Sequence, residues 1–180
     1  MKLTILAGSN RPGGSTRKIA AQLAGFYTII GQPAEIMDLA DLPPEIYSPT
    51  SYEEKPASFR KFSDAILASD GVHIVAPEYN GGPPGVLKYF IDMLKFPESF
   101  ERRPVAFTGV SLDLWGALRS IEQLQAIFAY RNAHLFPTRV FLPGIARLLS
   151  AEGRLTDPEL IARLREQAAG FVKFVGTLRP

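Results

Sequence analysis

The feature that most constrains the fold is an apolar run that stops at a glycine and gives way to a loop of small and polar residues. Leu3 to Ala7 is almost wholly apolar, Gly8 follows, and residues 9–16 read Ser-Asn-Arg-Pro-Gly-Gly-Ser-Thr. An amphipathic pattern then begins at Ile19. This order predicts a buried strand, a tight loop and a helix. The loop is a candidate phosphate site, because unpaired backbone N–H groups and the helix dipole favour an anion at a helix N-terminus. An ordinary helix-capping loop has a similar composition, so the rest of the sequence is needed to distinguish a phosphate site from a plain capping loop.

Composition narrows the class of protein. The chain has 180 residues, of which 46% are hydrophobic and 21% charged, and its net charge is +2. We expect a single domain over residues 1–180, with no nucleic-acid or membrane partner. There is no cysteine and there are only two histidines, which excludes disulfides and thiolate catalysis and predicts no metal site. The first residues show no signal-peptide pattern and no apolar run reaches membrane-spanning length, so the expected location is the cytoplasm.

Apolar periodicity along the chain predicts alternating strands and helices. The expected strands cover residues 2–7, 34–38, 71–77 and 104–110, with a fifth split into 133–136 and 138–142. The expected helices cover residues 15–30 and 57–68, a segment starting near Pro83 or Pro84, residues 117–132, and a last helix introduced by a capping box from Thr156 to Glu159. Residues 41–56 show no period and are predicted to form a surface loop. The order predicts a flavodoxin-like, doubly wound, five-stranded parallel sheet with strand order 2-1-3-4-5.

Three glycine-rich loops fall at the ends of strands that this topology makes neighbours. They cover residues 8–16, 77–85 and 109–116, after the first, third and fourth strands. Because ligands of open α/β sheets bind beyond the carboxyl ends of the strands, we expect these loops to form one site.

The first loop discriminates among phosphate-binding motifs. A dinucleotide fingerprint requires a glycine where Asn10 stands, and a P-loop requires a lysine where Gly14 stands. The remaining hypothesis is flavin mononucleotide (FMN), whose single phosphate could be held by the hydroxyls of Ser9, Ser15 and Thr16 and by a guanidinium from Arg11 or Arg17.

The other loops suit the flat ring of a flavin. Backbone N–H groups from Glu78 to Gly82 could bond its polar rim, and Tyr79 could pack along one face. Glu78 is expected to cap or brace the loop rather than act as an acid or base. The single tryptophan, Trp115, is open to two interpretations: it lines a pocket, or it covers the end of the sheet. Buried His73 is expected to be a structural core residue.

Two of these loops resemble the NADPH-dependent FMN reductase family, which includes azo-, quinone- and chromate-reducing members. The resemblance rests on Gly-Ser-Asn-Arg-Pro-Gly-Gly-Ser-Thr at 8–16, on Pro-Glu-Tyr-Asn-Gly at 77–81 and on Pro-Gly-Val-Leu-Lys at 84–88. It implies a homodimer or homotetramer with non-covalent FMN, a phosphate held by Ser9, Arg11, Ser15 and Thr16, and a ring lined by residues 77–81. It also places Arg11 near incoming NADPH, and residues 111–119 over the ring. The expected cofactor-binding residues are Ser9, Arg11, Gly14, Ser15, Thr16, Pro77, Glu78, Tyr79, Asn80, Gly81, Ser111 and Trp115.

The chain departs from the family pattern at several glycine and serine positions. Gly14 stands where a hydroxyl residue is usual, Gly82 stands where serine is common, and Asp113 and Ala117 occupy glycine places in the third loop. The third loop also gains bulk from Leu112 and Trp115, which affects the room over the flavin.

These features lead to the hypothesis of an oxidoreductase that passes a hydride from NADPH or NADH through FMN to a small acceptor, with flavin N5 and no side chain as the catalytic group. The alternatives are a flavodoxin-type electron carrier, which the slightly basic charge disfavours, and a non-catalytic FMN-binding or flavin-free sensor or scaffold.

Overall fold

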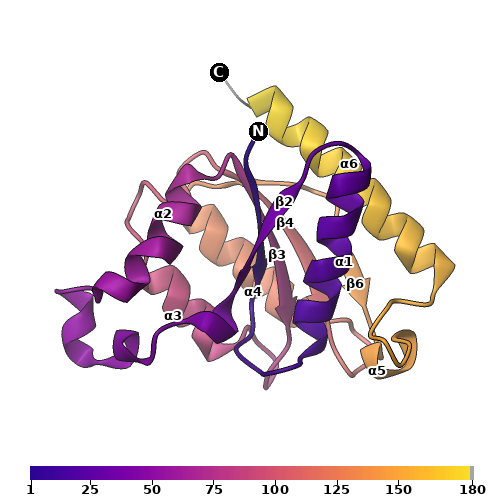
Figure 1. Cartoon of the computed structure of the whole chain (residues 1–180), viewed down its shortest axis with the longest axis horizontal. Coiled ribbons are helices and arrows are strands. Elements are labelled where there is room, and N and C mark those ends of the chain that lie inside the picture. Colours follow the sequence, from indigo (N-terminus) through magenta and orange to yellow (C-terminus); the bar gives the residue numbers. More distant parts are fainter. Residues whose placement is uncertain (179–180) are drawn as a thin grey trace.

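The computed structural model describes residues 1–178 and contains one parallel β-sheet covered by helices on both faces (Figure 1). Its order is β2-β1-β3-β4-β5, with β6 also paired to β4, which confirms the predicted topology. The strands are β1 (Leu3–Ala7), β2 (Ala34–Asp38), β3 (Gly71–Pro77), β4 (Pro104–Val110), β5 (His134–Leu135) and β6 (Val140–Leu142). The helices are α1 (Ser15–Ile29), α2 (Arg60–Ala68), α3 (Gly85–Met93), α4 (Leu118–Tyr130), α5 (Ile145–Leu148) and α6 (Pro158–Leu178).

The central strands are apolar throughout because both of their faces are buried. Every residue of β1, β3 and β4 is buried. Alternate residues of β1 face opposite layers: Leu6 packs in the core that includes α2, α3 and α4, whereas Leu3 and Ile5 pack in the core that includes α1 and α6. The β1–β3 register sets Ala7 opposite Val75, so the loops after these strands leave the sheet side by side.

The fifth strand is split, as the sequence predicts. β5 pairs with the start of β4, where Pro104 lies opposite His134, and β6 pairs with its end, where Val110 lies opposite Leu142. Pro137 lies between the two pieces and has no N–H for a continuous ladder.

The segment from 41 to 56 is more ordered than a loop. Short 3-10 helices cover Leu39–Asp41, Pro44–Tyr47, Pro49–Tyr52 and Ala57–Phe59, the last of which precedes α2. Fully buried Ile46 anchors the segment, and its carbonyl accepts a hydrogen bond from the hydroxyl of Tyr89 on α3. Single 3-10 turns have no extended apolar period, so periodicity alone does not reveal them.

The predicted capping box at α6 is wrong in detail. Asp157, not Thr156, provides the cap: its Oδ1 accepts a hydrogen bond from Leu160 N at 3.0 Å. The Thr156 hydroxyl instead donates to Leu148 O at 3.0 Å, which ties the start of α6 to the end of α5.

His73 is a structural core residue, as predicted, and it belongs to a buried chain of hydrogen bonds. Thr108 Oγ1 donates to Gln167 Oε1 at 2.8 Å, so the contact of 2.9 Å between Thr108 Oγ1 and His73 Nε2 requires Nε2 to carry the proton. Nδ1 then accepts from the Tyr27 hydroxyl at 2.8 Å. Burial lowers the pKa of His73 to about 3, so the ring is neutral.

Within residues 1–178, no helix is both long and apolar enough to cross a membrane.

Candidate cofactor-binding site

A cavity of about 540 Å³ opens at the carboxyl ends of β1, β3 and β4, where the three glycine-rich loops were expected to meet. Its lining comes from those loops and from the start of α5. The lining residues are Ser9, Arg11, Pro12, Gly13, Gly14, Ser15, Thr16, Pro77, Glu78, Tyr79, Val110, Ser111, Leu112, Asp113 and Ile145.

The first loop is held close to β3 by Gly8. Gly8 N donates to Val75 O at 2.9 Å, and a Cβ at this position would lie 2.9 Å from Leu87 Cδ2 on α3. A side chain there would push the loop away from the sheet. Ser9 follows and is nearly buried, with its Oγ 2.9 Å from the hydroxyl of Tyr79 in the second loop. The first two loops are therefore joined across the floor of the cavity.

The N-terminus of α1 faces the cavity without a capping side chain. Its N-cap is Gly14, whose lack of a side chain leaves the first-turn N–H groups uncapped, and the first turn contains no acidic residue. The hydroxyl residues Ser15 and Thr16 line the cavity beside these N–H groups. This part of the cavity is suited to a phosphate, because no side chain of the helix competes with an anion for the N–H groups of the first turn.

The two arginines proposed for the phosphate have different surroundings. Arg17 forms an ion pair with Asp38, with Nε 3.2 Å from Oδ2. Arg11 lines the cavity, and within residues 1–178 no carboxylate is paired with it. Arg11 is therefore the better candidate for a phosphate ligand.

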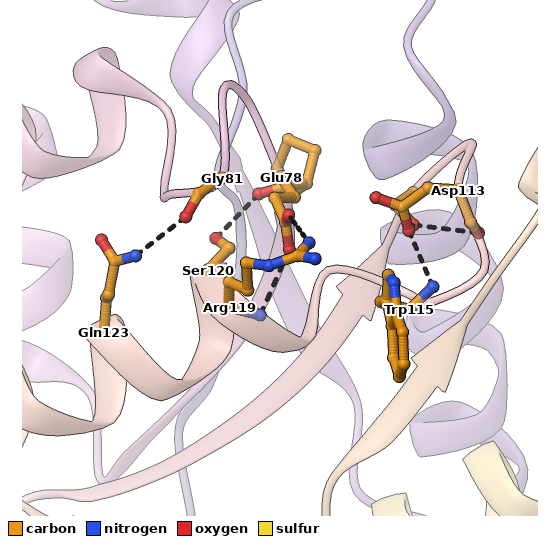
Figure 2. A network of polar contacts seen from close by, with 9 residues as sticks. Glu78, Gly81, Asp113, Trp115, Arg119, Ser120 and Gln123 are labelled. Atoms are coloured by element: carbon orange, nitrogen blue, oxygen red, sulfur yellow. Dashed lines mark hydrogen bonds and ion pairs between the residues drawn. The ribbon is translucent and has the colours of Figure 1, made fainter.

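The second loop is a tight turn at its tip. Tyr79 and Gly82 exchange backbone hydrogen bonds, and Asn80 and Gly81 both have positive φ, of 52° and 76°. Positive φ at both central residues is typical of a type I′ turn, which the Asn-Gly pair favours. Gly81 O accepts from Gln123 Nε2 of α4 at 2.9 Å (Figure 2). Asn80 and Gly81 thus lie outside the cavity lining, whereas Pro77, Glu78 and Tyr79 belong to it.

Glu78 braces the loop against α4, as its position predicts (Figure 2). Its Oε1 accepts from Arg119 Nη1 at 2.8 Å and its Oε2 from Arg119 N at 3.2 Å, and its side chain is only 5% exposed. Ser120 Oγ adds a hydrogen bond to Pro77 O at 2.8 Å. The carboxylate of Glu78 serves as the cap of α4, whose N-cap residue Ala117 provides no side-chain hydrogen bond.

The third loop is organised by Asp113. Its Oδ1 accepts from Ser111 Oγ at 2.6 Å and from Trp115 N at 2.8 Å (Figure 2), and its carbonyl accepts from Gly144 N at 2.9 Å. The hydrogen bond from Ser111, followed by that from the Trp115 backbone, lowers the pKa of Asp113. The carboxylate is therefore ionised at neutral pH.

Trp115 and Ala117 show how the loop tolerates its unusual residues. Trp115 is 57% exposed, lies outside the cavity lining, and has the Arg119 guanidinium 5.9 Å from its ring centroid. Ala117 keeps a left-handed conformation with φ of 71°, which costs an L-residue roughly 1–2 kcal/mol. The backbone shape suited to glycine is thus retained without the glycine.

Sequence reasoning missed part of the cavity wall. Leu112 and Asp113 were noted only as departures from a family pattern, and Ile145 of α5 carries no motif. Ile145 is brought in by topology: its N–H donates to Ser111 O at 2.9 Å, next to the Asp113–Gly144 bond. Ile145 is identified as a wall residue only by its contact with Ser111, which lies more than thirty positions earlier in the sequence.

The sheet order and the cavity at its carboxyl edge define a flavodoxin-like α/β protein with an anion-suited loop after the first strand. The chain belongs to the NADPH-dependent FMN reductase family, whose sequence model matches residues 1–146. It is 28% identical over 183 residues to an NAD(P)H-dependent FMN reductase of Pseudomonas aeruginosa, covering 99% of this chain and 97% of the relative. It is 30% identical over 162 residues to a quinone reductase of Pseudomonas putida, covering 86% and 84% of the two chains.

Solved structures agree on the fold. The flavoenzyme NAD(P)H:(acceptor) oxidoreductase FerB of Paracoccus denitrificans superposes with a TM-score of 0.79 at 22% identity, covering 98% of this chain and 97% of that chain. Flavodoxin 1 of Bacillus cereus gives a TM-score of 0.64 at 18% identity, covering 96% and 98%.

Proposed function

We propose that this chain is an NAD(P)H-dependent oxidoreductase that binds FMN and passes a hydride from NADPH or NADH to a small acceptor such as a flavin, a quinone, an azo compound or a metal oxyanion. Relatives named as FMN, quinone and azo reductases support this activity. The observation that carries the proposal is the cavity itself, because an anion-suited helix N-terminus and two further loops meet there in one space.

The donor set of the cavity fits FMN. The α1 N-terminus without a side-chain cap and the hydroxyls of Ser9, Ser15 and Thr16 suit a phosphate, as does Arg11, which pairs with no carboxylate within residues 1–178. Val110, Leu112 and Ile145 provide apolar wall for a flat ring, and Tyr79 of the second loop also lines the cavity. FMN, when bound, supplies the hydride-accepting centre.

The protein's part in this proposal is to bind, orient and shield. Ser9, Arg11, Gly14, Ser15 and Thr16 hold the phosphate. Pro77, Glu78 and Tyr79 form the ring side, Asn80 and Gly81 shape the turn that carries them, and Ser111 and Trp115 belong to the covering loop. The Ser9–Tyr79 and Glu78–Arg119 contacts fix the spacing between loops, so the site is largely preorganised.

The proposal has a direct test. The purified protein should take up FMN and turn yellow, lose the yellow flavin absorbance on anaerobic addition of NADPH, and regain it when a quinone is added. Colour without bleaching by NADPH or NADH would favour a carrier or sensor. A protein that stays colourless after incubation with FMN would contradict FMN binding.

We further propose that residues 1–180 act as a single domain in the cytoplasm and assemble into a homodimer or homotetramer. The apolar groove between α3 and α4 supports self-association. Its volume is about 480 Å³, and exposed Phe96 and Tyr130 lie along it with ring centroids 6.1 Å apart.

A further inference from the structure

The third loop contributes a carboxylate to the cavity lining. Asp113 lines the cavity together with apolar Leu112, whereas Arg11 lines it from the first loop. The hydrogen bonds from Ser111 Oγ and Trp115 N both reach Oδ1 and hold the side chain in a defined position. The carboxylate is thus a fixed feature of the wall.

The positive charges around the cavity do not neutralise the negative charge of Asp113. The charge of Arg119 helps to lower the pKa of Asp113, but its guanidinium is bonded to Glu78 at 2.8 Å. Arg17 is paired with Asp38, and Arg147 lies at the Gly144 turn outside the cavity lining. Arg11 remains, and in the proposed function it faces the cofactor phosphate. Glu78 and Arg119 are paired with one another, which leaves the charge of Asp113 in excess on the third loop.

We propose that Asp113 is a specificity-determining residue that makes the site select uncharged, apolar electron acceptors over anionic ones. The apolar component comes from Leu112, which lines the cavity and is 72% exposed, so it offers its side chain to an incoming molecule. The hydride donor carries its negative charges on its phosphates and not on its dihydronicotinamide ring, so we assign the selection to the acceptor. This inference rests on the proposed function, because it requires an acceptor to bind in the cavity.

The expected effect of the Asp113 charge on acceptor binding is set by the solvent exposure of the carboxylate. Asp113 is solvent-exposed, so its charge acts through a high effective dielectric and is screened by salt. A unit charge about 4 Å away in water changes a binding constant by about fivefold. We therefore expect a discrimination of about three- to fivefold from this residue at low salt.

The experiment compares the FMN-loaded wild type with Asp113→Asn, which keeps the Oδ1 acceptor and removes the charge. The probes are anthraquinone-2-sulfonate and the uncharged 2-(hydroxymethyl)anthraquinone. Equilibrium dialysis without NAD(P)H measures binding without turnover, and quenching of Trp115 fluorescence reports occupancy beside the loop. Asp64→Asn on α2 is the matched control, since it makes the same chemical change at an exposed position outside the cavity.

The inference predicts that Asp113→Asn tightens sulfonate binding about three- to fivefold and leaves the uncharged quinone unchanged. The gain should shrink at high salt, and Asp64→Asn should show none. An equal change for both probes, no change for either, or failure of both to bind the holoprotein would overturn it. The FMN content of each preparation is measured first by absorbance, so a failure to bind FMN is separated from a failure of Asp113 to discriminate.

Discussion

Charged residues of opposite sign line the cavity from different loops, Arg11 from the first and Asp113 from the third. Arg11 is the cation left for a phosphate, since Asp38 neutralises Arg17 and Glu78 neutralises Arg119. A carboxylate introduced among the proposed phosphate ligands would place a negative charge where the α1 dipole favours an anion.

Ser15→Glu should therefore weaken FMN binding by at least about tenfold, because the new carboxylate repels the phosphate from a few ångströms away. Titration of the apoprotein with FMN, followed by flavin fluorescence, measures the change. Ser15→Gln is the control for side-chain size and should lose much less affinity. Equal losses in the two variants would place the phosphate elsewhere.

The buried ring of His73 makes stability depend on pH. Its pKa is about 3 in the folded protein against an ordinary 6.5, so the unfolded chain binds an extra proton between those values. The stabilisation is complete above pH 6.5 and is lost as the pH falls, with a slope that approaches about 1.4 kcal/mol per pH unit.

Urea unfolding between pH 7 and pH 5 isolates this effect. Asp113 and Glu152, the carboxyls with a lowered pKa, start from ordinary values of 3.8 and 4.5 and so act mainly below this range. His73→Gln offers an acceptor and a donor to the same neighbours without the titration. Its free energy of unfolding should change less over this interval, and an identical slope in the two proteins would refute the assignment.

At the scale of elements, the beginnings of helices depend on contacts that are local in some cases and distant in others. α6 is capped within its own sequence by Asp157, whereas α4 is capped by Glu78, 41 positions before Arg119. A local cap leaves a signature in the sequence, and a distant one does not.

Asp157→Ala should lower the free energy of unfolding by about 1 kcal/mol, because it leaves the Leu160 N–H without its cap. Thermal and urea denaturation measure the loss. Glu159→Gln, which alters the acidic residue of the predicted capping box, should cost less than about 0.5 kcal/mol. A larger loss in the free energy of unfolding for Glu159→Gln than for Asp157→Ala would support the predicted capping box instead.

The strands show what sequence patterns resolve well. β2, β3 and β4 have the predicted bounds, because each is a short run flanked by turn residues or prolines. The 3-10 turns between β2 and α2 were not foreseen, since they are held by tertiary anchors such as Ile46. Within the site, the loops and the bracing role of Glu78 could be predicted from composition and topology. The wall residue Ile145 and the Ser9–Tyr79 bond could not, because they depend on contacts across separate loops.

At the scale of the whole molecule, the groove between α3 and α4 exposes large aromatic side chains, Phe96 and Tyr130. Tyr130 is 76% exposed, and the Arg131 guanidinium lies 5.0 Å from the ring centroid of Phe96. Large aromatic groups on a surface are typical of an interface, and helix faces of this kind pair well by two-fold symmetry.

We expect the wild type to migrate as at least twice its chain mass of 19.8 kDa in light scattering after size exclusion. Tyr130→Arg should raise the dissociation constant at least about tenfold, because it places like charges across the symmetric contact. Ile29→Arg is the matched control, since Ile29 is 74% exposed on α1, away from the groove. A monomeric wild type, or equal effects of the two variants, would contradict this interface.

The split fifth strand also bears on aggregation. A free sheet edge is a template onto which another chain can add a strand. Here one edge is broken into β5 of two residues and β6 of three, and the other, β2, carries Glu35 and Asp38 within its five residues. Neither edge offers a long apolar ladder. Crowding or partial unfolding should therefore lead less readily to strand-stacked fibrils, and contacts between copies are left to the helical surfaces.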